Sequence, residues 1–95
     1  MASIFSAETA AGKNVLIYSG PDSASRENGT VYLSRDDGKT WPVKKVLFPG
    51  NFAYSVLTQL PNGEIGCLFE TDSANRIVFA RFPLVWLEEI NFVGP

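Results

Sequence analysis

One run of eight residues constrains the fold more than any other stretch of this chain. The run reads S-x-D-x-G-x-T-W and has strand-forming residues before and after it. Its aspartate can accept backbone N–H bonds across a turn, and the flanking hydroxyls can add short-range hydrogen bonds. An Asp-Gly pair tolerates positive φ, and tryptophan supplies a large apolar anchor. The run therefore predicts a hairpin turn held by its own side chains, with fixed positions Ser34, Asp36, Gly38, Thr40 and Trp41.

Size and composition exclude several classes of protein. A chain of 95 residues is one small domain at most, and its formal net charge of −2 gives no electrostatic basis for binding nucleic acid or an anionic membrane. The absence of histidine excludes a His-based triad or a His-ligated metal site within this sequence. Cys67 stands alone, so an intrachain disulfide is impossible. We therefore predict no cofactor and no metal.

The sequence contains no apolar stretch long enough to span a bilayer. The first residues, Met1 to Ala7, have neither a basic region nor a long apolar run, so we predict no signal peptide. The chain is expected to begin in the middle of a fold.

The whole sequence predicts about seven short antiparallel strands and one short terminal helix that opens at Pro83. Residues 14–19 are almost continuously apolar, as expected for a strand covered on both faces. Asn62-Gly63 between two apolar runs predicts a tight hairpin. The polar residues 20–29 and the group Pro49-Gly50-Asn51 are predicted to be connections. The expected strands cover residues 3–6, 14–19, 32–34, 43–48, 52–60, 64–70 and 77–82.

Strands at this spacing fit a sandwich, a barrel or a propeller. The eight-residue run resembles the Asp-box of β-propeller proteins, and this resemblance selects the propeller. The predicted fold class is all-β: a partial β-propeller of about one and a half blades, with a short C-terminal helix. We expect a single partial domain over residues 1–95, in which 1–49 form the Asp-box blade and 50–95 form part of the final blade plus the helix.

Three stretches together resemble the C-terminal part of non-viral exo-α-sialidases. They are SRENGTV at 25–31, AYSVLTQLPNGEIGCLFE at 53–70 and IVFARFPLVWL at 77–87. They occur in the order found in the family and at compatible spacing, and together they span nearly the whole chain. This combination is far more specific than the Asp-box alone, which occurs in propellers of many functions.

The resemblance implies a six-bladed propeller that hydrolyses terminal sialic acids of glycoconjugates with retention of configuration. By position, Tyr54 resembles the nucleophile, because a neutral phenol can approach an anomeric carbon that already bears a carboxylate. Arg26 resembles the last of three arginines that clamp that carboxylate, a task suited to a guanidinium fork. Glu70 resembles the carboxylate that orients the first of these arginines. The Asp-box is expected to have a structural role only.

The same resemblance identifies what this sequence lacks. The acid/base aspartate, two further arginines and the glutamate that activates the tyrosine belong to earlier blades, and no motif for them occurs here. We therefore interpret the chain as a sialidase fragment, inactive alone, whose partners are the missing N-terminal blades and a sialylated substrate. The strand at 77–82 is expected to be left as an exposed sheet edge. The alternatives are a non-catalytic propeller for sialic-acid binding or adhesion, and an Asp-box propeller of unrelated function.

Overall fold

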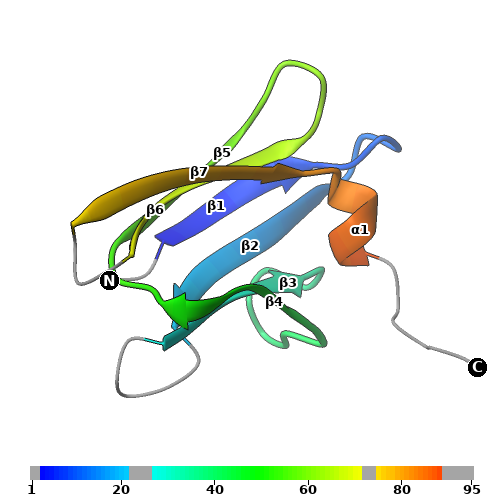
Figure 1. The fold of residues 1–95 in the computed structure, drawn as a ribbon. Helices are drawn as coiled ribbons and strands as arrows, with labels where there is room; N and C mark the ends of the chain where they lie inside the picture. The colour runs from blue at the N-terminus through cyan, green and yellow to red at the C-terminus, as the bar shows by residue number, and fades with distance from the viewer. Residues whose placement is uncertain (1–2, 22–26, 72–74, 89–95) are drawn as a thin grey trace, which may run out of the picture.

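The computed structural model describes residues 3–21, 27–71 and 75–88, which form two antiparallel β-sheets and one short helix (Figure 1). The predicted seven strands and terminal helix are confirmed. The elements are β1 (Ser3–Glu8), β2 (Asn14–Pro21), β3 (Glu27–Ser34), β4 (Val43–Asn51), β5 (Ser55–Gln59), β6 (Ile65–Thr71), β7 (Arg76–Phe82) and α1 (Leu84–Glu88).

Each sheet is a meander in which strands adjacent in sequence pair with one another. The first sheet has the order β1-β2-β3-β4 and the second has the order β5-β6-β7. Tight turns permit this topology, since Gly12 (φ 83°), Asp37 (φ 60°), Gly38 (φ 90°) and Gly63 (φ 91°) all adopt the left-handed conformation in the turns. Of the seven strands expected from the sequence, four fall within residues 1–49 and three within residues 50–95, and the two sheets divide in the same way.

Two predicted connections are wrong because strands continue into them. The group Pro49-Gly50-Asn51 belongs to β4, whose last residue, Asn51, pairs with Glu27 across register shifts in β3. Proline has no backbone N–H to donate. It is tolerated here because β4 is an edge strand of its sheet, and because a register shift leaves some backbone groups of the strand unpaired. The predicted loop 20–29 is also too long, since β2 extends to Pro21 and β3 begins at Glu27; residues 22–26 lie outside the described part of the chain.

The strand predicted over residues 52–60 begins only at Ser55, because Phe52 is drawn into the core. Phe52 is fully buried, and its ring centroid lies 4.8 Å from that of Phe69 on β6. A Cβ atom added to Gly29 on β3 would lie 2.1 Å from the same ring. The ring therefore fills the space between the two sheets at a point where only glycine leaves room.

An apolar core formed by the described residues lies between the facing sides of the two sheets. It combines residues of the four-stranded sheet, residues of the three-stranded sheet, and two from the helix. Its fully or almost fully buried members include Ile17, Val31, Leu33, Ile65, Cys67, Phe69 and Leu87.

The helix α1 extends this core along β3 and β4, with which it is in contact (Figure 1). Its first turn uses the carbonyl of Pro83, which accepts a hydrogen bond from Trp86 N at 3.0 Å. The Trp86 ring packs against Phe82, with ring centroids 5.0 Å apart. Lys45 of β4 lies over the same ring at 4.9 Å and also donates to the Trp86 carbonyl, so the helix is attached to both sheets.

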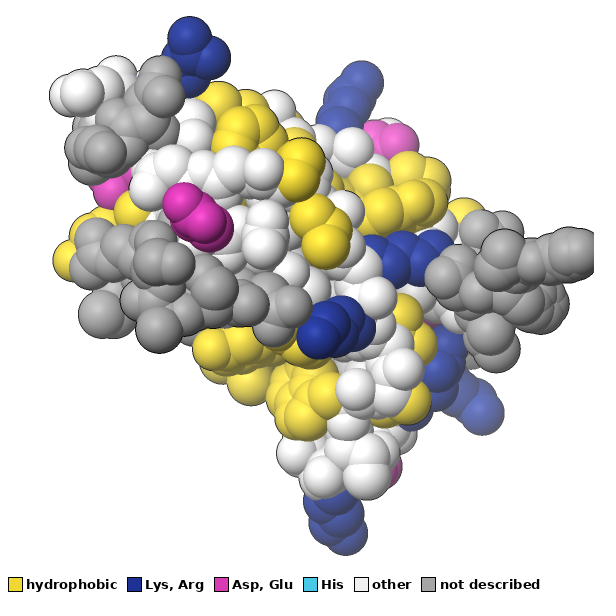
Figure 2. Space-filling model, turned by 60° about the horizontal axis from the view of Figure 1, so that its bottom comes forward, with side chains coloured by type: hydrophobic (Ala, Val, Ile, Leu, Met, Phe, Trp, Pro, Cys, Tyr) yellow, Lys and Arg dark blue, Asp and Glu magenta, His cyan; other side chains and the backbone are white. Residues whose placement is uncertain are grey.

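The outer faces of the two sheets remain partly apolar and open. On β2, burial alternates along the strand, and Tyr18 is 37% exposed. The expectation that residues 14–19 are covered on both faces is therefore wrong for the described structure. On the second sheet the exposed row includes Val56, Leu68, Ile77 and Phe79. Hydrophobic side chains gather in several surface patches (Figure 2).

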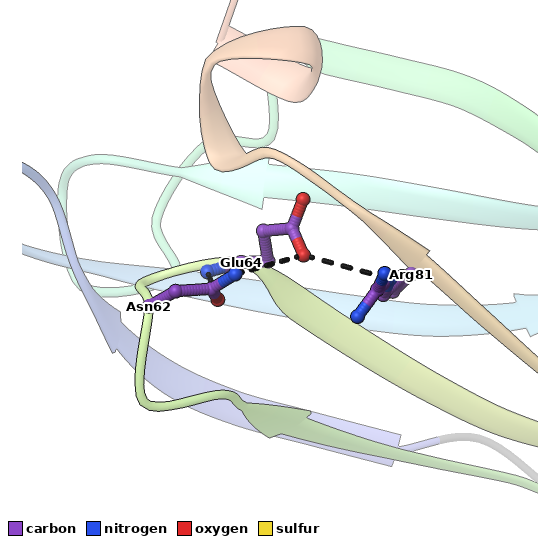
Figure 3. Close-up of polar contacts among 3 residues, drawn as sticks. All are labelled: Asn62, Glu64 and Arg81. Atoms are coloured by element: carbon purple, nitrogen blue, oxygen red, sulfur yellow. Dashed lines mark hydrogen bonds and ion pairs between the residues drawn. The ribbon is translucent and has the colours of Figure 1, made fainter.

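The β5–β6 turn is joined to β7 by a small polar cluster (Figure 3). Asn62 accepts a hydrogen bond from Glu64 N at 3.0 Å, and its amide donates to Glu64 Oε1 at 3.2 Å. The same Glu64 oxygen lies 3.7 Å from Arg81 Nε on β7. Because these groups are largely in contact with solvent, the cluster orders the turn more than it stabilises the fold.

Candidate active site

The predicted Asp-box forms a closed hydrogen-bonded turn between β3 and β4. Asp36 Oδ1 accepts from Thr40 N and from Ser34 Oγ, both at 2.8 Å, and Asp36 Oδ2 accepts from Thr40 Oγ1 at 2.6 Å. Ser34 Oγ in turn accepts from Gly38 N at 2.9 Å. Trp41 Nε1 donates to the Gly38 carbonyl at 3.1 Å. The side chains thus satisfy the turn backbone, which leaves little of the box available to a ligand.

These contacts lower the pKa of Asp36 to about 2, chiefly through the Thr40 hydroxyl and then through the Thr40 backbone and Ser34. A carboxyl whose pKa is lowered in the folded state stabilises the fold when ionised. We therefore expect its stabilisation to be complete above about pH 4 and to be lost as the pH falls toward about 2. Thermal unfolding followed by circular dichroism between pH 2 and pH 6 measures this. The Asp36→Asn variant should lack that pH dependence, and an unchanged acid profile in the variant would contradict the assignment.

The two described catalytic candidates lie opposite one another at the start of β5. Glu70 N donates to the Tyr54 carbonyl at 3.0 Å, and Ala53 N donates to the Glu70 carbonyl at 3.0 Å. The bond between Glu70 N and the Tyr54 carbonyl continues the β5–β6 register, in which Ser55 pairs with Phe69, by one position beyond the strand; the bond from Ala53 N is shifted by one residue. Because side chains alternate along this ladder, Tyr54 and Glu70 lie on the same outer face as Val56 and Leu68. The Tyr54 side chain is 50% exposed and Glu70 is half-buried.

The third candidate, Arg26, lies outside the described residues. The described residue that follows it, Glu27, pairs with Asn51, three positions before Tyr54. The residue at the other side of the gap, Pro21, pairs with Gly29. The end of β2 at Pro21 and the start of β3 at Glu27 therefore lie at the end of the molecule where β4 leads into Tyr54.

The Asp-box lies at the other end of β3. Strand β3 runs from Glu27 to Ser34, which separates its two ends by roughly 23 Å at the rise of an extended strand. The box therefore does not belong to the group formed by Tyr54 and Glu70. A hollow of about 660 Å³, lined by the β1–β2 turn, the β5–β6 turn and α1, is also at the far end of β5 from Tyr54.

A buried polar pair beneath Tyr54 was not anticipated from the sequence. Ser55 Oγ and Ser19 Oγ lie 2.8 Å apart and connect β5 to β2. Burial raises the pKa of the Cys67 thiol to about 11, and the influence of the Ser19 side chain acts in the opposite direction. The available signal was a serine at the end of an otherwise apolar strand and another directly after Tyr54.

The described part of the chain contains no group of three or more Asp, Glu, Cys or His side chains suited to hold a metal ion. Among the same residues, no helix has the length and apolar character needed to cross a membrane.

Comparison with known proteins shows what this chain is similar to. No protein-family model matches the chain. A sialidase of Micromonospora viridifaciens is 44% identical over 81 residues, which are 85% of this chain and 12% of that protein. Sialidase-2 of Cricetulus griseus is 38% identical over 77 residues, or 73% of this chain and 20% of the relative. The solved structure of the Hadza microbial sialidase Hz136 superposes with a TM-score of 0.81 at 33% identity, over 92% of this chain and 18% of that chain.

The fold and these matches define a homologue of the sialidases, which are glycosidases. This chain is a partial sialidase homologue: it spans only 12% to 20% of the length of the three proteins compared. Its two sheets and helix match part of the sialidase fold.

Proposed function

We propose that this chain is the part of an exo-α-sialidase that carries the tyrosine nucleophile, and that it acts only together with further propeller blades. The observation that carries the proposal is the pairing of Tyr54 with Glu70 on one face of the second sheet. In this proposal, residues 1–49 form the Asp-box blade of a six-bladed propeller, and residues 50–95 form part of the final blade plus the short helix.

The chemistry follows from the charge of the substrate. The anomeric carbon of a sialic acid bears a carboxylate, which would repel an anionic nucleophile and admits a phenol. A base outside this chain takes the proton of the Tyr54 phenol as Tyr54 Oη attacks this carbon. The bond to the leaving glycosidic oxygen breaks, and an acid outside this chain protonates that oxygen. Water then cleaves the tyrosyl intermediate, so two inversions give net retention. Arg26 would hold the substrate carboxylate through two parallel hydrogen bonds, and Glu70 would orient a neighbouring arginine of the same clamp.

The open apolar faces support the need for further blades. Ile4 on the outer face of the first sheet is 60% exposed, and Val56 and Phe79 on the outer face of the second are 60% and 52% exposed. Large side chains with such exposure on contiguous sheet faces are typical of surfaces that pack against another protein surface. In the proposed propeller, adjoining blades cover both faces.

A chimera tests the proposal. The segment of the Micromonospora viridifaciens sialidase that matches this chain is replaced by the chain itself, and hydrolysis of a fluorogenic sialoside is measured. We expect turnover by the chimera and none by the 95-residue chain alone. Turnover by the isolated chain would refute its dependence on further blades. A folded chimera that binds sialic acid without turnover would favour the non-catalytic alternative.

A further inference from the structure

Strand β5 is an edge strand of the second sheet among the described elements, and its free side faces the first sheet. Every second residue of β5 makes a polar contact across this boundary. Ser55 Oγ lies 2.8 Å from Ser19 Oγ, and Leu57 N donates to Ser3 Oγ at 3.3 Å. The Gln59 amide accepts from Glu8 N and donates to the Glu8 carbonyl, both at 2.9 Å. We call these three contacts the polar seam.

The Ser19–Ser55 contact differs from the rest of the polar seam in its burial. Ser19 is 0% exposed and Ser55 is 6% exposed, whereas the Gln59 contacts are at the surface. Burying two hydroxyls in an apolar core is costly unless they bond with one another. A polar junction of this kind specifies one relative position of the two sheets.

The junction lies directly behind the candidate nucleophile. Ser55 follows Tyr54 in the chain, and their side chains point to opposite faces of the sheet. The main chain at Tyr54 is held from β6 by the hydrogen bond of Glu70 N. From β2 it is held by the Ser19–Ser55 contact. We propose that Ser19 and Ser55 are positioning residues whose hydrogen bond fixes the main chain at Tyr54 relative to the first sheet.

The catalytic meaning of this contact rests on the proposed function, in which Arg26 comes shortly after β2 in the sequence and Tyr54 precedes β5. A nucleophile displaced by about 1 Å can lose about a hundredfold in rate. A direct bond between β2 and β5 holds these two strands in one relative position.

The first test is independent of activity. The chain contains three tyrosines, so incorporation of 3-fluorotyrosine gives three ¹⁹F NMR signals, assigned by single Tyr→Phe variants. The main variant is Ser19→Ala/Ser55→Ala, which leaves neither hydroxyl unpaired and should fold. We expect the Tyr54 signal to shift and broaden while the Tyr32 signal stays unchanged. The control Ser3→Ala, which removes another contact of the polar seam, should leave the Tyr54 signal in place.

A Tyr54 signal in the double variant that superposes on that of the parent chain would overturn the proposal. The single variant Ser55→Thr keeps a hydroxyl and should restore the parent signal. If the double variant does not fold, Ser55→Thr against Ser55→Ala in the chimera gives the same comparison through kinetics. There we expect Ser55→Ala to lower kcat about tenfold with little change in KM, and Ser55→Thr to recover most of it. Equal kcat values for Ser55→Ala and Ser55→Thr would refute the positioning role. A failure of the proposed function is distinguishable, because the chimera would then keep its activity in Tyr54→Phe.

Discussion

Replacing Phe52 by alanine is expected to lower the free energy of unfolding by about 3–5 kcal/mol. The side chain is fully buried, and its ring packs between Gly29 of the first sheet and Phe69 of the second. Truncation removes the apolar contacts of the ring and leaves a cavity, because the backbone on either side belongs to two different sheets and cannot close over it. Small domains have total stabilities of about 5–15 kcal/mol, so much of the fold's stability depends on this ring.

Urea-induced unfolding followed by far-UV circular dichroism measures this loss. The matched control is Phe79→Ala, since Phe79 is also a strand-associated phenylalanine but is 52% exposed on the outer face. We expect the control to cost much less, about 1 kcal/mol or below. Equal losses for Phe52→Ala and Phe79→Ala would show that the core between the sheets does not dominate the stability of the chain.

Local patterns in the sequence account for the parts of the fold that were predicted correctly. Tight turns at Asp37-Gly38 and Asn62-Gly63 join strands that are neighbours in sequence, so turn chemistry sets the pairing of β3 with β4 and of β5 with β6. The pairing of Tyr54 with Glu70 follows from the same rule. The two residues are each eight positions from Asn62, and the ladder of β5 and β6 continues in that register to reach them.

Contacts between distant parts of the chain account for the parts that were missed. Phe52 was assigned to a strand by its propensity, but its ring is required between the sheets, 23 residues after the glycine that it covers. The Ser19–Ser55 bond joins residues 36 positions apart, and no local pattern marks two serines as partners. The alternation on β2 was missed because Tyr18, although large and apolar in character, faces outward. For Phe52 and for the two serines, the deciding contacts lie between the two sheets, which a local pattern does not show.

Removing one oxygen atom from Tyr54 is expected to abolish nearly all turnover in the chimera. In Tyr54→Phe the ring and its packing remain, while the phenol oxygen that would form the bond to the anomeric carbon is lost. Without a nucleophile, the covalent route is closed, and only the stabilisation supplied by the rest of the site remains. Loss of a nucleophile costs several orders of magnitude in other enzymes, so we expect kcat to fall by roughly 10³-fold or more.

Initial rates with a fluorogenic sialoside, measured on chimeras of matched circular dichroism, determine this ratio. Tyr18→Phe is the control, because Tyr18 is also partly exposed but lies on the outer face of the first sheet, beside Tyr32 and Trp41. The loss of the phenol oxygen in Tyr18→Phe should leave kcat unchanged. If Tyr54→Phe kept the parent rate, then Tyr54 would not be the nucleophile. The pairing of Tyr54 with Glu70 would in that case be a feature of sheet architecture alone.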